Sequence, residues 1–172
     1  WDARMEASCE ANPESLTAPW LKALAAGGIS RLSLGAQASQ PHLLSALGRG
    51  HSWAQVEEGV RMARAAGIRN LNLDLMTGFP GQTREDLKET LEAALALAPE
   101  HLSCYSLILE EGTALYARVR SGGAELPDEE TLLEMDALTR DMLAAAGYIQ
   151  YEVSNYALPG YACRHNRNCW EY

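Results

Sequence analysis

The stretch that decides the fold class is NLNLDLMTGFPGQT, residues 70–83. Leucines alternate with Asn70, Asn72 and Asp74, and this two-residue period is typical of a β-strand with one polar face. The glycine- and proline-containing turn that follows ends at Thr83, which resembles the first residue of a capping box closed by Asp86. This stretch therefore predicts a strand that leads directly into a helix.

The same order of strand and helix recurs along the chain. Strands are expected at Met5–Ala11, Ser30–Ala36, Asn70–Met76, Leu102–Ile108 and Ile149–Ser154. Helices are expected at Glu14–Ala26, Trp53–Ala66, from Thr83 to Pro99, and at Asp128–Ala146. Such alternation indicates βαβ units on a parallel sheet. Because polar residues occupy alternate strand positions, we predict an α/β fold of the partial, open βα-barrel kind rather than a sheet buried on both faces.

Composition narrows the class of protein. The 172 residues are 47% hydrophobic and carry a formal net charge of −9, which suits one globular domain and disfavours binding to nucleic acid. No apolar run approaches the roughly 20 residues that span a bilayer, so membrane contact is not predicted. The four cysteines are scattered without a C-x-x-C pair, so we expect no disulfide framework and a cytoplasmic location.

Four polar residues are candidate site residues because of their place relative to the strands. Glu10, Gln37 and Asp74 come at the ends of three predicted strands, and Arg49 lies in the loop after the second. Chemistry in βα barrels sits at the carboxyl ends of the strands. Each residue also has a structural alternative: a turn-forming acid, a helix cap, or a buried acid paired with a backbone amide.

The turn Gly78–Thr83 has two interpretations. Its glycines, proline and threonine suit a strand-to-helix turn. A phosphate cradle is the alternative, but the turn lacks the lysine and the glycine spacing of a nucleotide-binding loop. We favour the structural interpretation.

Five blocks in order resemble the radical S-adenosylmethionine core of oxygen-independent coproporphyrinogen III oxidases and their relatives. The blocks are Glu10–Pro13 (EANP), Arg31–Gln37 (RLSLGAQ), Leu47–His51 (LGRGH), Asn72–Thr83 (NLDLMTGFPGQT) and Leu126–Glu130 (LPDEE). The resemblance covers essentially the whole chain. It implies an open βα barrel of the radical S-adenosylmethionine type, with contacts to that cofactor from Glu10, Gln37, Arg49 and Asp74.

The resemblance also implies a 4Fe–4S cluster, which the family holds in a C-x-x-x-C-x-x-C loop after its first strand. No such spacing occurs here: Cys163 and Cys169 are six residues apart, and Cys9 and Cys104 are isolated. We expect the cluster ligands to lie upstream of Trp1, the barrel to be truncated at both ends, and the fragment alone to be inactive. No catalytic residue is therefore assigned.

The segment from Cys163 to Trp170, CRHNRNCW, resembles the H-N-x-x-Y-W motif of the haem-chaperone (HemW) branch of the family. His165 becomes a candidate ligand of haem iron, because imidazole is a common axial ligand. Cys169 stands where the motif has tyrosine, and its thiolate is the alternative ligand. A local hydrogen bond of His165 is the structural alternative. Residues 1–154 are accordingly assigned to the core barrel, and residues 155–172 to the start of a haem-motif segment.

These observations support three hypotheses. The first is a fragment of a haem chaperone that binds S-adenosylmethionine, a 4Fe–4S cluster and haem or porphyrin, and delivers haem to acceptor proteins. The second is an oxygen-independent coproporphyrinogen III dehydrogenase, which decarboxylates its substrate oxidatively to protoporphyrinogen IX, so the sequence leaves open whether the parent is an enzyme. The third is a non-radical βα barrel that binds a nucleotide-like ligand. Upstream cysteines in the C-x-x-x-C-x-x-C spacing would exclude the third.

Overall fold

A computed structural model describes residues 5–171 and contains one mixed sheet of six strands in the order β1-β2-β3-β4-β6-β5. The strands are β1 Ser8–Ala11, β2 Arg31–Gln37, β3 Asn70–Thr77, β4 His101–Ser106, β5 Ile149–Gln150 and β6 Asn155–Ala157. Neighbours among β1 to β4 are parallel, as the alternation of strands and helices predicts. The α/β fold is therefore confirmed, with parallel pairing from β1 to β4 and antiparallel pairing beyond β4.

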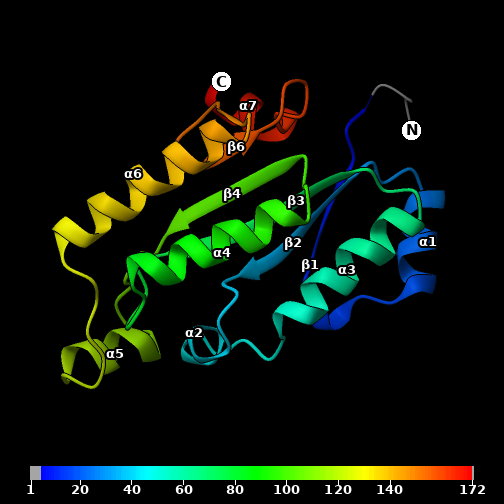
Figure 1. The fold of residues 1–172 in the computed structure, drawn as a ribbon. Helices are drawn as coiled ribbons and strands as arrows, with labels where there is room; N and C mark the ends of the chain where they lie inside the picture. Colours follow the sequence, from blue (N-terminus) through cyan, green and yellow to red (C-terminus); the bar gives the residue numbers. More distant parts are fainter. Residues whose placement is uncertain (1–4, 172) are drawn as a thin grey trace.

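The helices lie mainly on one side of this sheet. Their bounds are η1 Pro13–Ser15, α1 Ala18–Ala26, α2 Pro41–Ala46, α3 Trp53–Ala65, α4 Arg84–Ala96, α5 Ala114–Arg120, α6 Glu129–Ala145 and α7 Arg164–Glu171. Helices α3 and α4 run across the same face of the sheet, and α6 packs beside α4 (Figure 1). The short helices α2, α5 and α7 were not expected from the sequence.

The two faces of the sheet have opposite chemistry. The apolar face, which the helices cover, includes the buried residues Leu32, Leu34, Leu71, Leu73 and Leu102. The polar face carries Arg31, Ser33, Asn72, Asp74, His101, Ser103 and Asn155, which the register places beside one another. Burial of apolar side chains under α3, α4 and α6 supplies the core. The polar face corresponds to the inner face of the expected barrel.

Side-chain caps explain where the helices begin. Ser52 and Gln55 form a capping box at α3, and Thr83 and Asp86 form one at α4. Asp128 caps α6 by accepting a hydrogen bond from the Thr131 amide at 2.8 Å. These starts agree with the sequence to within a residue.

The first helix begins later than expected. Ser15 does not cap a helix: it ends the 3-10 turn η1, and its hydroxyl donates to the Asn12 carbonyl at 2.8 Å. Thr17 caps α1 instead, and its side chain accepts from the Trp20 amide. The single helix predicted for Glu14–Ala26 is thus a short turn followed by α1, because Leu16 has an extended backbone.

The last predicted strand is also different. Instead of one strand at Ile149–Ser154, β5 and β6 form an antiparallel hairpin, and β6 lies between β4 and β5. The turn is tightened by the Glu152 carboxylate, which accepts from the Ser154 amide at 2.8 Å. The hairpin turns the chain back, so the sheet is mixed at this end. The expected division after residue 154 falls within the hairpin and stays a prediction.

The sheet has two edges within the described residues. β1 pairs only with β2, and β5 pairs only with β6. Near β1, Met5 is exposed. An unpaired edge and an exposed apolar side chain at the first strand are what the interpretation as a partial barrel predicts.

We expect the core under α3 and α4 to dominate stability. Leu73 is fully buried, so Leu73→Ala should lower the free energy of unfolding by about 2 to 5 kcal/mol. Leu133→Ala is the matched control, because Leu133 is 64% exposed on α6. Denaturant unfolding followed by circular dichroism measures both; equal losses in the two variants would contradict this account of the core.

Candidate functional site

The four residues predicted at the strand ends lie together. One pocket of about 250 Å³, the strand-end pocket, is lined by Glu10, Gln37, Arg49 and Asp74, together with Ala11, Asn12 and Gly35. The pocket is at the carboxyl ends of β1, β2 and β3, where a βα barrel places its chemistry. The predicted convergence of these side chains is present, while their role as ligand contacts stays a prediction.

A bulge in β2 directs Gln37 into this pocket. The register skips Ala36, since Gly35 is opposite Asp74 and Gln37 is opposite Leu75. Gln37 has φ of 64°, which is left-handed backbone and uncommon for a residue other than glycine. The ring of His51 stabilises the bulge, because its Nε2 lies 3.1 Å from the Ala36 carbonyl oxygen.

Gly35 leaves room for the side chains that shape the pocket. A Cβ at position 35 would lie 3.0 Å from Nε2 of Gln37 and 3.4 Å from Oδ1 of Asn12. Asn12 in turn accepts a hydrogen bond from Nη1 of Arg49 at 3.2 Å. Arg49 forms no ion pair among residues 5–171, so its guanidinium can pair with an anionic ligand. Asn12 and Gly35 were not singled out from the sequence, although both belong to blocks that carry the family resemblance.

Asp74 is held by two side chains of the polar face. The Ser33 hydroxyl donates to its Oδ2 at 2.9 Å, and Nδ2 of Asn72 donates to its Oδ1 at 2.7 Å. Burial raises the pKa of Asp74, and these hydrogen bonds oppose that rise. The carboxylate is thus fixed in orientation at the pocket wall, where it can accept hydrogen bonds from a ligand.

His101 belongs to a hydrogen-bonded network behind Asp74. Its Nδ1 lies 2.5 Å from Oδ1 of Asn72, and its Nε2 lies 2.7 Å from the Tyr151 hydroxyl. Burial, and then the charge of Arg31, lower the pKa of His101 to about 3, so the ring is neutral at physiological pH. No motif in the sequence singles out His101. Its place opposite Asn72 in the register is a long-range feature that the sequence does not display.

The candidate haem ligands lie one turn apart on α7. Sγ of Cys169 is 3.9 Å from Nε2 of His165, and both side chains are exposed. Helix α7 is anchored by Trp170, whose indole donates to Oε2 of Glu152 at 3.2 Å. Beside it lies a groove of about 320 Å³, lined by Tyr105, Glu152, Asn155, Asn166, Cys169 and Trp170. The contact with Cys169 is also the local interaction that the structural alternative for His165 requires.

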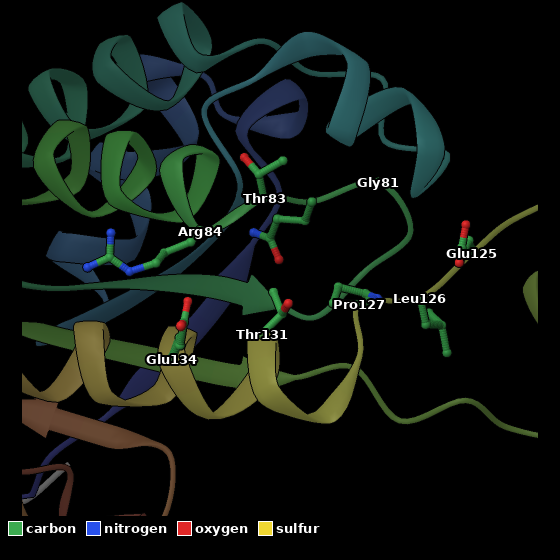
Figure 2. Close-up of a pocket in the computed structure, with 9 residues that line it drawn as sticks. Gly81, Thr83, Arg84, Glu125, Leu126, Pro127, Thr131 and Glu134 are labelled. Carbon is green, nitrogen blue, oxygen red and sulfur yellow. The ribbon is translucent and has the colours of Figure 1, made fainter.

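A larger groove of about 440 Å³ lies between the starts of α4 and α6 (Figure 2). Two backbone amides of the turn before α4 are already paired within the protein. The Gly78 amide donates to Oε1 of Gln82 at 2.7 Å, and the Thr83 amide donates to Asp86. Two carboxylates, Glu125 and Glu134, also line the groove and outnumber its one cationic side chain, Arg84. Both observations disfavour a bound phosphate, and they favour the structural interpretation of the turn.

The cysteines provide no evident metal centre in the part of the chain described. Among residues 5–171, no three His, Cys, Asp or Glu side chains gather in a way that could hold a metal ion. The four cysteines are free, and burial raises the pKa of the Cys104 thiol to about 12. The described residues therefore do not fit a 4Fe–4S cluster. No helix among them is long and apolar enough to cross a bilayer.

Comparison with known proteins identifies the family. Residues 2–94 match the Radical SAM superfamily. The chain belongs to the Radical SAM superfamily. In structure it is similar to coproporphyrinogen III oxidase (HemN) from Escherichia coli, a radical SAM enzyme, with a TM-score of 0.81 and 26% identity over 92% of this chain and 36% of that one.

Curated relatives place the chain near one branch of this superfamily. It is 41% identical to the haem chaperone HemW of Mycobacterium tuberculosis over 166 residues, which are 96% of this chain and 43% of the relative. It is 38% identical to the haem chaperone HemW of Escherichia coli over 170 residues, which are 99% of this chain and 44% of the relative. The chain thus resembles HemW throughout, and it spans less than half the length of these relatives.

The neutral, buried His101 predicts a pH dependence of stability. Its pKa is about 3 in the folded chain against 6.5 ordinarily, so between these values only the unfolded chain binds the proton. The free energy of unfolding therefore falls as the pH falls through this window, by about 2 kcal/mol between pH 7 and pH 5 for this group. Asp74, whose pKa is raised, acts in the opposite direction.

Urea unfolding at the two pH values measures this dependence. His101→Gln should lose less stability than the wild type between pH 7 and pH 5, because it lacks the group that takes up the proton on unfolding. The contribution of Asp74 is present in both proteins and cancels in the comparison. His42→Gln is the control, since His42 is exposed. An identical pH dependence in His101→Gln and the wild type would show that His101 does not contribute.

Proposed function

We propose that this chain is part of a radical S-adenosylmethionine haem chaperone, with S-adenosylmethionine in the strand-end pocket and haem beside α7. The observation that carries the proposal is the convergence of Glu10, Gln37, Arg49 and Asp74 in one pocket. Membership of the superfamily and similarity to proteins named haem chaperones support it. Haem-acceptor proteins are the partners that this function requires, and the cytoplasm is the compartment that we propose.

The pocket chemistry suits a zwitterionic nucleoside. The guanidinium of Arg49, which contacts Asn12 but forms no ion pair among the described residues, can bind the methionine carboxylate in a bidentate pair. The carboxylates of Glu10 and Asp74 can accept hydrogen bonds from the ammonium group or the ribose hydroxyls. Gln37, held inward by the β2 bulge, offers both an amide donor and an acceptor. The 4Fe–4S cluster has no fitting ligand set among the described residues, so we assign it no contact here.

The groove beside α7 suits a flat, largely apolar ring. Tyr105 and Trp170 line it with aromatic surface, and the thiol of Cys169 faces it. His165 lies one turn from Cys169 on the same helix, so either side chain can approach an iron held there. We assign haem to this groove, with His165 as the iron ligand and Cys169 as the alternative.

The second candidate function is oxidative decarboxylation of coproporphyrinogen III. The specific observation in its favour is the similarity in fold to coproporphyrinogen III oxidase from Escherichia coli. Both functions use a porphyrin and the same strand-end pocket. An assay of protoporphyrinogen IX formation under anaerobic, reducing conditions with S-adenosylmethionine distinguishes them, because a chaperone forms no such product.

We expect charge removal in the strand-end pocket to weaken binding of S-adenosylmethionine. In the full-length protein, Asp74→Asn and Arg49→Gln should each raise the dissociation constant by about tenfold or more, because each removes a charge-assisted hydrogen bond. Isothermal titration calorimetry measures the constant. Arg69→Gln is the matched control, since Arg69 is exposed and outside the pocket. Unchanged affinity in both pocket variants would remove this assignment.

Haem titration tests the α7 site. In the full-length protein, His165→Ala should weaken haem binding and shift the Soret band, because an axial nitrogen ligand is lost. If the thiolate of Cys169 is the ligand, Cys169→Ala causes the shift instead. His42→Ala is the control, because His42 is an exposed histidine remote in sequence. Spectra unchanged in both α7 variants would leave α7 without a ligand role.

A further inference from the structure

A path of hydrogen bonds joins α7 to the strand-end pocket. At the start of α7, the Cys163 amide and Nδ2 of Asn166 donate to the Tyr151 hydroxyl at 3.3 and 3.2 Å. The Tyr151 hydroxyl lies 2.7 Å from Nε2 of His101. Nδ1 of His101 lies 2.5 Å from Oδ1 of Asn72. The path thus runs from α7 across the polar face to Asn72.

Asp74, at the end of the path away from α7, sets the direction of these hydrogen bonds. Nδ2 of Asn72 donates to Oδ1 of Asp74, because an ionised carboxylate can only accept. Oδ1 of Asn72 must therefore face His101, which donates from Nδ1 and accepts from Tyr151 at Nε2. Arg31 also approaches Nδ1, but at 3.5 Å its contact is the longer one. Every link then donates toward Asp74.

A second branch reaches the other end of α7. The Ser103 hydroxyl lies 3.1 Å from Oδ1 of Asn72 and 2.6 Å from Oδ1 of Asn155. Nδ2 of Asn155 donates to Oε1 of Glu152, whose Oε2 accepts from Trp170. The single hydrogen of Ser103 can serve only one of these two oxygens at a time, so this branch is weaker than the path through Tyr151 and His101.

We propose that Tyr151 and His101 are positioning residues that couple occupancy of the strand-end pocket to the placement of α7. A ligand group that donates to Asp74 competes with the amide of Asn72 for the same carboxylate. If that amide rotates, its NH₂ group faces the Nδ1–H of His101, and the chain of donors must reverse. After reversal Nε2–H of His101 also donates to the Tyr151 hydroxyl, so three donors compete for its two lone pairs, and either the Cys163 amide or Asn166 loses its acceptor.

This coupling extends the proposed function, because it predicts that S-adenosylmethionine and haem alter each other's affinity. The coupling itself does not require either ligand to be present. One test therefore substitutes Asp74 and measures the effect on α7 without any ligand. A second test measures the binding of the two ligands.

The ligand-free test is a double-mutant cycle in the full-length protein with Asp74→Asn, Tyr151→Phe and both together. Hydrogen exchange of the α7 amides, read by mass spectrometry, reports the placement of the helix. We expect each single variant to speed exchange by about threefold or more, and the double variant to be no faster than the faster single one. Tyr161→Phe is the control, because the Tyr161 hydroxyl has no hydrogen bond among the described residues, and it should combine with Asp74→Asn additively. Additive effects in the Tyr151 cycle, or no effect of Asp74→Asn, would overturn the proposal.

The ligand test measures the dissociation constant of S-adenosylmethionine with and without haem. We expect a ratio of about fivefold or more in the wild type, and a ratio near one in Tyr151→Phe. A ratio of one in the wild type, with both ligands bound, would overturn the coupling and leave the proposed function standing. If neither ligand binds, the proposed function fails, and the exchange cycle alone decides the coupling.

Discussion

The polar face of the sheet must satisfy its own hydrogen bonds. Parallel strands project every second side chain to the same face, so the alternation that buries leucines under the helices also brings Ser33, Asn72, His101 and Ser103 together on the other side. Buried polar groups are costly unless they are paired. The network that these residues form is therefore a condition for the sheet, and it also holds Asp74 at the mouth of the strand-end pocket.

The sequence predicted the parts of the fold that depend on local patterns. Alternation located β2 and β3 closely, and capping residues located α3, α4 and α6. The β5–β6 hairpin was missed because a two-residue strand has no period to detect. The four pocket residues were found because strand ends and the family resemblance agree on them.

Other parts of the site depend on contacts between distant segments. The bulge at Ala36 appears only when β2 is paired with β3, and Asn12 matters only because Arg49 reaches it from another loop. His101 and Tyr151 are 50 residues apart, and no local sequence pattern indicates that their side chains form a hydrogen bond. The arrangement on α7 is similar in this respect, since Trp170 is placed by Glu152 of the preceding hairpin.

The left-handed backbone of Gln37 has a consequence for how this molecule responds to selection. A non-glycine residue in that conformation costs about 1 to 2 kcal/mol, and the side chain of Gln37 lines the pocket together with Gly35 and Asp74. Glycine at position 37 relieves this cost and removes the side chain. Directed evolution for heat resistance alone would therefore favour glycine at position 37, and the pocket would lose the amide side chain that lines it.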